Sequence, residues 1–136
     1  MSIRKSMAAV LGCGVIAVSI GAASAQEEED RPTNIPQKVA VLRGLDKTTA
    51  RVSEMSVPVG KPFRFGALEV VVRACMARPP EEPPESTAFL DVKEIKPSGE
   101  KEKVFTGWVF ASTPALNAMQ HPIYDVWLIK CKAAGG

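Results

Sequence analysis

The stretch 107–131, GWVFASTPALNAMQHPIYDVWLIKC, decides the fold. It contains both tryptophans, the single tyrosine, the single histidine and one of the three cysteines of the chain. Two runs of β-branched and aromatic residues, 104–111 and 123–130, enclose a segment of small and turn-forming residues. Such runs favour strands, so the stretch predicts two strands with a connection that is too long for a tight hairpin.

The connection itself carries signals for a short helix. Ser112 or Thr113 suits an N-cap, and Pro114 suits the first helical position. The residue before Pro122 is disfavoured in the helical conformation, which ends the helix at His121. We therefore expect a strand, a short helical crossover and a second strand.

The rest of the chain repeats the strand signal. Short runs with period-two alternation are separated by Gly and Pro, and no segment of helical period follows the N-terminal region. These features predict an all-β fold, a small sandwich or barrel of about seven short strands with one helical crossover. The further strands are expected at 38–42, 48–57, 63–65, 68–74 and 87–95.

The N-terminus has the layout of a secretory signal peptide over residues 1–25. Basic residues precede an apolar segment, and Ala23-Ser24-Ala25 forms a small-residue cleavage site. An uncleaved membrane anchor is the alternative, although the apolar segment is short for spanning a bilayer. Lipid attachment at Cys13 is a second alternative. The sequence predicts export to the periplasm or beyond, with cleavage near Ala25.

Removal of residues 1–25 would leave one domain and a nearly neutral chain. We expect a flexible acidic and proline-containing lead at 26–37, a single β domain at 38–132 and a tail at 133–136. Loss of two basic residues with the signal peptide leaves 15 basic residues against 15 acidic ones. This balance does not favour nucleic acid, and no membrane span is expected after cleavage.

Two cysteines, Cys75 and Cys131, remain after cleavage. An even pair in an oxidising compartment predicts a disulfide, worth about 4 kcal/mol in the chain-entropy treatment. Free buried thiols and a metal site are the alternatives, but two cysteines and one histidine make a poor zinc set. No metal and no cofactor are expected.

Candidate catalytic residues are Ser112, His121 and Asp125, the residue types of a hydrolytic triad. The sequence has no nucleophile elbow, and each residue has a structural interpretation. Ser112 suits a helix cap, and His121 is expected to pack on its loop and bond backbone. Asp125 is expected to share a face with Trp127 and Cys131 and to pin the crossover.

Partners expected for Asp125 are Tyr124, amides of 112–121 or Arg73, with a ligand site as the alternative. The tryptophans Trp108 and Trp127 are expected to fill the core. If they instead face the surface, they would form a stacking platform for a sugar.

A proline-rich acidic segment follows Cys75. Four prolines in eight residues favour polyproline II, and three glutamates add negative charge. A stiff solvated loop is one interpretation, and a preformed docking epitope for a partner is the other. The candidate partner-binding residues are Pro79, Pro80, Glu81, Glu82, Pro83, Pro84 and Glu85.

Four segments resemble an exported alphaproteobacterial family, domain of unknown function 2155. They read LRGLDKTTARVSEMSVPVG, FGALEVVVRAC, RPPEEPPESTAFLDV and FTGWVFASTPALNAMQHPIYDVWLIKC, and the resemblance covers about 39–131. It implies a cell-envelope or secreted protein with a small domain that holds a cysteine pair, and it implies no activity.

The leading hypothesis is a non-enzymatic periplasmic β domain that binds an envelope protein or complex. The alternatives are a small cell-wall or glycan hydrolase that uses His121 and Asp125, and a glycan-binding module that uses Trp108 and Trp127. The sequence does not indicate an oligomeric state.

Overall fold

The computed structural model describes residues 12–17, 21 and 33–135. The chain divides into two compact units, 1–30 and 31–136, and the strands described below belong to the second. The predicted cleavage site and most of the predicted signal peptide lie outside the described residues. No helix in the described part of the chain is long and apolar enough to cross a membrane.

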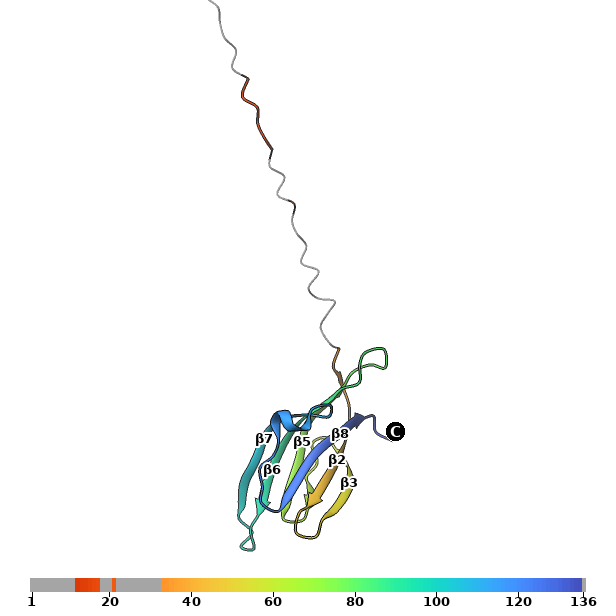
Figure 1. The fold of residues 1–136 in the computed structure, drawn as a ribbon, viewed down its shortest axis with the longest axis vertical. Coiled ribbons are helices and arrows are strands. Elements are labelled where there is room, and N and C mark those ends of the chain that lie inside the picture. The colour runs from red at the N-terminus through yellow and green to blue at the C-terminus, as the bar shows by residue number, and fades with distance from the viewer. Residues whose placement is uncertain (1–11, 18–20, 22–32, 136) are drawn as a thin grey trace, which may run out of the picture. The chain divides into compact units, whose positions relative to one another are not determined.

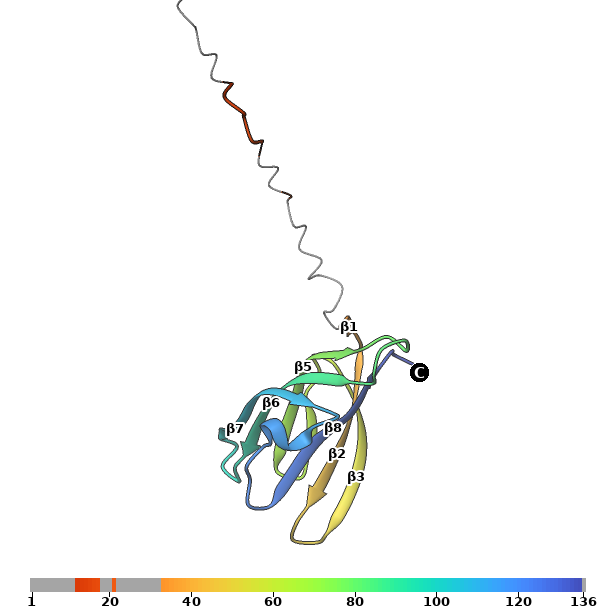
Figure 2. The same cartoon turned by 45° about the horizontal axis from the view of Figure 1, so that its top comes forward.

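The second unit is an all-β sandwich, as predicted (Figures 1 and 2). One sheet has the order β1-β5-β6-β7, with β4 also paired to β5, and the other has the order β3-β2-β8. Every pairing is antiparallel. The elements are β1 (Ile35–Pro36), β2 (Val39–Asp46), β3 (Arg51–Pro58), β4 (Phe63–Phe65), β5 (Leu68–Ala77), β6 (Ser86–Ile95), β7 (Lys101–Phe110), the 3₁₀ helix η1 (Pro114–Asn117) and β8 (Tyr124–Lys132).

The eight strands include one that the sequence did not predict. In β1, Ile35 pairs with Ala77 and Pro36 with Met76. These two residues fall in the segment expected to be a flexible lead, so the ordered domain begins ahead of Lys38. A pairing of only two residues has no periodicity to detect, and proline is tolerated there because the strand lies at a sheet edge.

The core lies between the two sheets and contains aliphatic side chains from both. Leu42, Leu68, Leu90 and Leu128 are its largest fully buried members. Alternation along each strand places these positions on the inner face, because successive side chains of a strand point to opposite faces. The other buried members are Ala40, Met55, Val57, Val70, Val72, Cys75, Ala88, Val92, Val109, Met119, Val126 and Cys131.

A β-bulge in β5 decides where Cys75 points. The register with β6 passes from Val72 opposite Leu90 to Ala74 opposite Phe89, which leaves Arg73 as the extra residue. Simple alternation would put Cys75 on the outer face, opposite in phase to Val72. The extra residue shifts the alternation by one position, so the side chain of Cys75 lies in the core. Ala74, which plain alternation would place on the inner face, is not a core member.

A second bulge, in β8, decides in the same way where Cys131 points. Leu128 lies opposite Leu42 and Lys130 lies opposite Val41, so Ile129 is the extra residue. Cys131 therefore shares the inner face with Leu128. The expectation that Asp125 and Trp127 share a face with Cys131 was wrong, because the alternation was extended across this bulge.

The predicted disulfide is confirmed. Cys75 and Cys131 are bonded, with their Cα atoms 5.7 Å apart and a sequence separation of 56. Because Cys75 belongs to the five-stranded sheet and Cys131 to the three-stranded sheet, the bond links the two layers of the sandwich.

The crossover between β7 and β8 passes from one sheet to the other. Its helix is a single 3₁₀ turn with Pro114 in the first turn, as expected. Thr113 occupies the N-cap but makes no side-chain cap, and the hydroxyl of Ser112 bonds to Glu85 instead. The prediction of a side-chain cap was therefore wrong.

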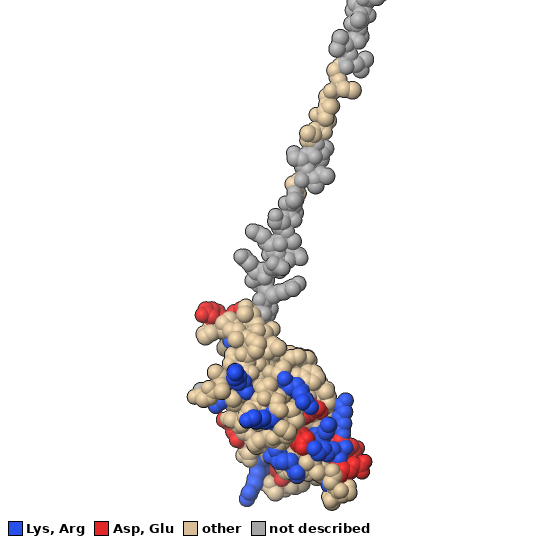
Figure 3. All heavy atoms as spheres, turned by 180° about the vertical axis from the view of Figure 1, so that it is seen from behind, with Lys and Arg blue, Asp and Glu red and all other residues tan. Residues whose placement is uncertain are grey.

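The outer face of the five-stranded sheet carries many basic side chains. Figure 3, seen from behind Figure 1, shows lysine and arginine atoms spread over it. Two ion pairs lie on this face. Arg73 Nη2 is 3.3 Å from Asp91 Oδ2, and Lys101 Nζ is 3.0 Å from Glu69 Oε2.

Candidate functional site

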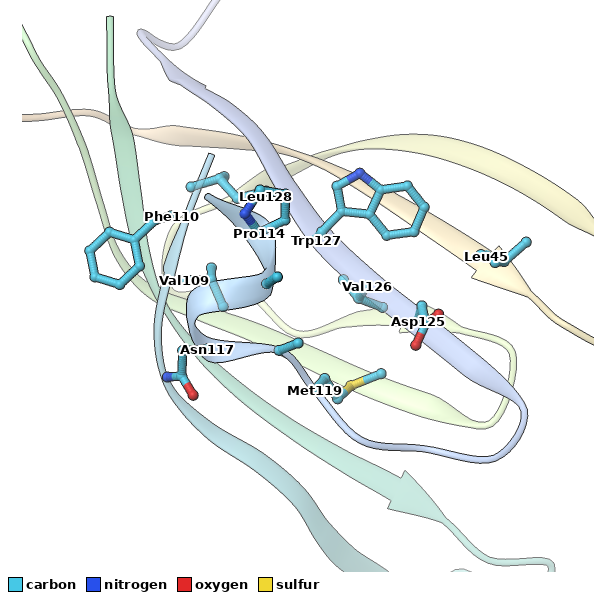
Figure 4. Close-up of a pocket in the computed structure, with 12 residues that line it drawn as sticks. Leu45, Val109, Phe110, Pro114, Asn117, Met119, Asp125, Val126, Trp127 and Leu128 are labelled. Carbon is cyan, nitrogen blue, oxygen red and sulfur yellow. The ribbon is translucent and has the colours of Figure 1, made fainter. Parts of the chain in front are cut away.

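An apolar groove lies between the crossover and β8, on the side of the sandwich where each sheet ends (Figure 4). Its volume is about 350 Å³. In the described part of the chain, β7 and β8 are the outermost strands at this side. The lining residues are Leu45, Val109, Phe110, Pro114, Ala115, Asn117, Ala118, Met119, Asp125, Val126, Trp127 and Leu128.

Core residues contribute to the lining. Val109, Val126 and Leu128 belong to the buried core, and Met119 is the one buried residue that the crossover contributes. The groove is therefore continuous with the hydrophobic interior. An occupant would bury apolar surface that the sandwich itself leaves open.

Asn117 fixes the crossover to β7. Its Nδ2 donates a 2.7 Å hydrogen bond to the carbonyl oxygen of Trp108. The Asn117 side chain thereby bonds the edge of β7 as a neighbouring strand would. Gly107 makes the approach possible, since a Cβ added there would lie 2.9 Å from Asn117 Nδ2. The wall of the groove is thus held in place before any ligand arrives.

Glu85 fixes the start of the crossover. Its carboxylate accepts hydrogen bonds from the hydroxyl and the amide of Ser112 and from the amide of Ser86. Burial raises the pKa of Glu85, but these hydrogen bonds and the charge of Arg78 outweigh burial and hold the pKa below its usual value of 4.5. The ionised carboxylate is therefore the form that the fold stabilises.

His121 fixes the end of the crossover. Its Nδ1 accepts hydrogen bonds from the amides of Ile123 and Tyr124, at 3.0 and 3.2 Å. The side chain is 6% exposed, and Nε2 lies 3.6 Å from Glu94 Oε2. The structure matches the expected packing on the loop and bonding of backbone, with Nδ1 engaged as an acceptor.

Lys47 joins His121 and Asp125. Its Nζ donates a 2.8 Å hydrogen bond to the carbonyl oxygen of His121 and lies 3.3 Å from Asp125 Oδ1. The ion-pair partner of Asp125 is therefore Lys47, which was not among the expected partners Tyr124, the amides of 112–121 and Arg73; Arg73 pairs with Asp91. The carboxylate does pin the crossover, but through a residue of the turn between β2 and β3.

Ser112 does not join the other two candidates. Its hydroxyl bonds Glu85 just before β6, whereas His121 lies beside Glu94 near the end of that strand. Glu94 lies eight positions along the strand from Ser86, which corresponds to about 26 Å. The geometry therefore does not assemble a Ser-His-Asp triad.

The acidic proline loop is partly committed to the fold. Glu82 accepts hydrogen bonds from the amide of Thr33 at 3.2 Å, and Glu85 holds Ser112. Of its three glutamates only Glu81 is classed as exposed. Two of the three charges proposed for docking thus bond within the protein. At the start of the loop, Arg78 Nε is buried and has no hydrogen-bond partner among the residues that the structure describes.

The prediction that both tryptophans fill the core was wrong. Trp108 is 40% exposed and packs edge to face on Phe89, with ring centroids 5.4 Å apart. Trp127 is half-buried and lies opposite Arg43 on the outer face of the three-stranded sheet. The inner positions beside them belong to Val109 and Val126, which are members of the buried core.

Sequence reasoning missed the groove and the residues that hold it. Asn117, Met119 and Lys47 carried no motif, and their partners lie in other strands. Within the crossover, only the apolar residues of the segment 115–119, which reads ALNAM, indicated a buried side. Across residues 12–17, 21 and 33–135, no group of three or more His, Cys, Asp or Glu is placed to hold a metal ion.

The fold and the groove together define a class: a small antiparallel β-sandwich with a disulfide between its sheets and an apolar groove at its open side. The chain belongs to the family described as "Uncharacterized protein conserved in bacteria (DUF2155)", which matches residues 40–131 and so includes both bonded cysteines. The predicted family membership is confirmed.

A curated relative is "Uncharacterized protein RP359" of Rickettsia prowazekii (strain Madrid E). It is 24% identical over 87 residues, which are 64% of this chain and 56% of the relative. The chain thus spans little more than half of that protein's length. No solved structure matches the chain.

Proposed function

We propose that the domain is an exported, non-enzymatic binding module of the cell envelope that holds an extended segment of a partner protein in the groove beside β8. The observation that carries the proposal is the groove itself, which joins the core of the sandwich to the surface. Its volume of about 350 Å³ falls in the range of ligand-binding pockets.

An extended segment is the occupant that this geometry favours. β8 is the outermost strand of its sheet, and the neighbouring element across the groove in the described residues is the crossover, which is not a strand. A free strand edge offers backbone donors and acceptors, while an adjacent pocket receives alternate side chains. Both features lie on one side of β8.

The fixed crossover supports a binding role. Glu85, Asn117 and Lys47 hold its start, middle and end, so the groove wall needs no ordering when a partner binds. A preorganised site loses less entropy on binding and so binds more tightly for the same contacts. The separation of Ser112 from His121 gives the hydrolase alternative no comparable support.

Export rests on the signal-peptide pattern of residues 1–25 and on the disulfide, which persists in oxidising compartments. Fractionation of cells that express the full chain, followed by N-terminal sequencing, tests it. We expect a periplasmic or secreted protein that begins at Gln26. An intact N-terminus at Met1 in the cytoplasm would contradict export.

Site-specific photo-crosslinking in the native bacterium tests the groove. A benzophenone amino acid at the exposed groove residue Ala118 is expected to give a discrete adduct with one envelope protein, and the same label at the exposed tail residue Ala134 is expected to give none. Mass spectrometry then locates the partner segment.

An occluding substitution supplies the matched control. Ala115→Trp fills the groove from an exposed position, so the adduct from Ala118 should disappear while the melting temperature stays unchanged. Identical adducts from Ala118 and Ala134, or an adduct that survives Ala115→Trp, would refute binding in the groove.

A further inference from the structure

The outer face of the five-stranded sheet carries an aromatic pair that the groove does not use. Phe89 and Trp108 are cross-strand partners in β6 and β7, and Trp108 remains 40% exposed. Burial in the core does not explain this indole, because the inward neighbour Val109 fills the core position. An indole on an open sheet face offers a flat apolar surface to a ligand.

A row of charged residues crosses the same face. Arg64 lies opposite Glu69, Glu69 opposite Lys93, and Lys93 opposite Lys103. The one acidic residue of the row, Glu69, is bound to Lys101. No acidic group among the described residues forms an ion pair with Arg64, Lys93 or Lys103, and like charges that lie opposite each other repel.

From this arrangement we infer that the outer face of the five-stranded sheet binds an acidic polysaccharide. The apolar face of one sugar ring stacks on Trp108, and carboxylates of neighbouring units bind Lys93 and Lys103. Charge complementarity selects the ligand, because the cationic row loses its internal repulsion when it meets anions.

Polar groups between the aromatic pair and the row suit a sugar. Asp91 accepts hydrogen bonds from Arg73 Nη2 at 3.3 Å and from Thr106 Oγ1 at 3.4 Å. The Arg73 side chain is still 54% exposed and retains free donors. Such groups can bond ring hydroxyls, which donate and accept in the same way as the hydroxyl of Thr106.

The position of the face argues against a peptide strand. β6 lies between β5 and β7, so its backbone groups are used by the sheet and no strand can be added to it; the outer edge in this part of the sheet belongs to β7. A ligand that lies across the face is therefore held by side chains. Lys93 lies four positions along the strand from Phe89, which corresponds to about 13 Å. This span requires an oligomer and not a single sugar.

Calorimetric titration of the mature protein with oligogalacturonate, which carries one carboxylate on each sugar ring, tests the inference. Two matched probes separate its two elements: the methyl-esterified oligomer has the rings without the charge, and polyglutamate has the charge without the rings. Both should bind at least about tenfold more weakly than oligogalacturonate, and raised salt should weaken the oligogalacturonate complex.

Variants of the face provide the second arm. Trp108→Ala, and separately Lys93→Ala with Lys103→Ala, should each weaken oligogalacturonate binding at least about tenfold, whereas Trp108→Phe should retain most of it. Lys61→Ala with Lys130→Ala removes the same charge from exposed positions outside this face and should leave the affinity unchanged.

Three results would overturn the inference: no binding of oligogalacturonate, equally tight binding of polyglutamate, or full affinity in folded Trp108→Ala. None of these results concerns the groove, so polysaccharide binding can fail while the proposal of partner binding in the groove stands.

Discussion

Reduction of the Cys75–Cys131 bond should cost this domain a large part of its stability. The bond closes a loop of 56 residues, and the chain-entropy treatment gives about 4 kcal/mol for a loop of that length at 25 °C. The free energy of unfolding of a small domain is only about 5–15 kcal/mol. At roughly 5 °C per kcal/mol, the melting temperature should fall by about 20 °C.

Urea denaturation followed by circular dichroism measures this loss. The best comparison is the oxidised protein against the same protein reduced, because both sulfur atoms then remain in the core and no cavity forms. Cys75→Ala with Cys131→Ala gives a second reference in which a small cavity adds to the cost. Intact mass before each titration confirms the redox state.

A loss below about 1 kcal/mol on reduction would refute the reasoning, because it would mean that the bond constrains the unfolded chain far less than its loop length implies. A loss that occurs in the alanine variant alone would attribute the stabilisation to packing of the sulfur atoms and not to the cross-link.

Three further outcomes follow from the contacts. Glu85→Gln should cost about 1–2 kcal/mol at pH 7 through its weakened bonds to Ser112. Because folding lowers the pKa of Glu85 below 4.5, this stabilisation is present above that pH and disappears as pH falls through the folded pKa. The gap between the two unfolding free energies should therefore close in acid, and a constant gap in pH-dependent urea titrations would contradict the assignment. Gly44→Ala should lower the unfolding free energy by about 1–3 kcal/mol, since the new Cβ would lie 2.6 Å from Phe65 Cζ; an unchanged urea midpoint would count against this packing. His121→Ala should cost about 1–3 kcal/mol by leaving two backbone amides without an acceptor, and a thermal melt identical to that of the wild type would remove its structural role.

The strands were predictable because their signal is local. Alternating apolar residues within β5, β6 and β8 reflect the two faces of each strand, and Gly and Pro mark the turns between them. The disulfide was predictable from the cysteine count and from the export that the N-terminal sequence predicts. Neither inference required knowledge of how distant segments meet.

The faces of the strands were harder to predict, because one extra residue reverses them. Arg73 in β5 and Ile129 in β8 are such residues, and nothing in their chemistry distinguishes them from ordinary strand positions. Trp127 and Asp125 were placed on the wrong face for this reason. Contacts between residues that are distant in sequence could not be predicted either: Lys47 and His121 are 74 positions apart.

The two bulges also govern how the two cysteines of this domain oxidise. Each bulge turns its cysteine inward, so in the folded domain each sulfur can reach only the other. Deletion of Arg73 would remove the extra residue and restore plain alternation in β5, with Cys75 two positions beyond Val72 and still facing the core. If the full-length strand instead paired with β6 without the bulge, Cys75 would lie three positions beyond Val72 and its thiol would face solvent, while Cys131 stayed enclosed. A chain in that register could not complete its internal bond, and its surface thiol would couple to a second chain. Formation of the bulge before oxidation thus decides whether the chain forms its internal bond or a covalent dimer.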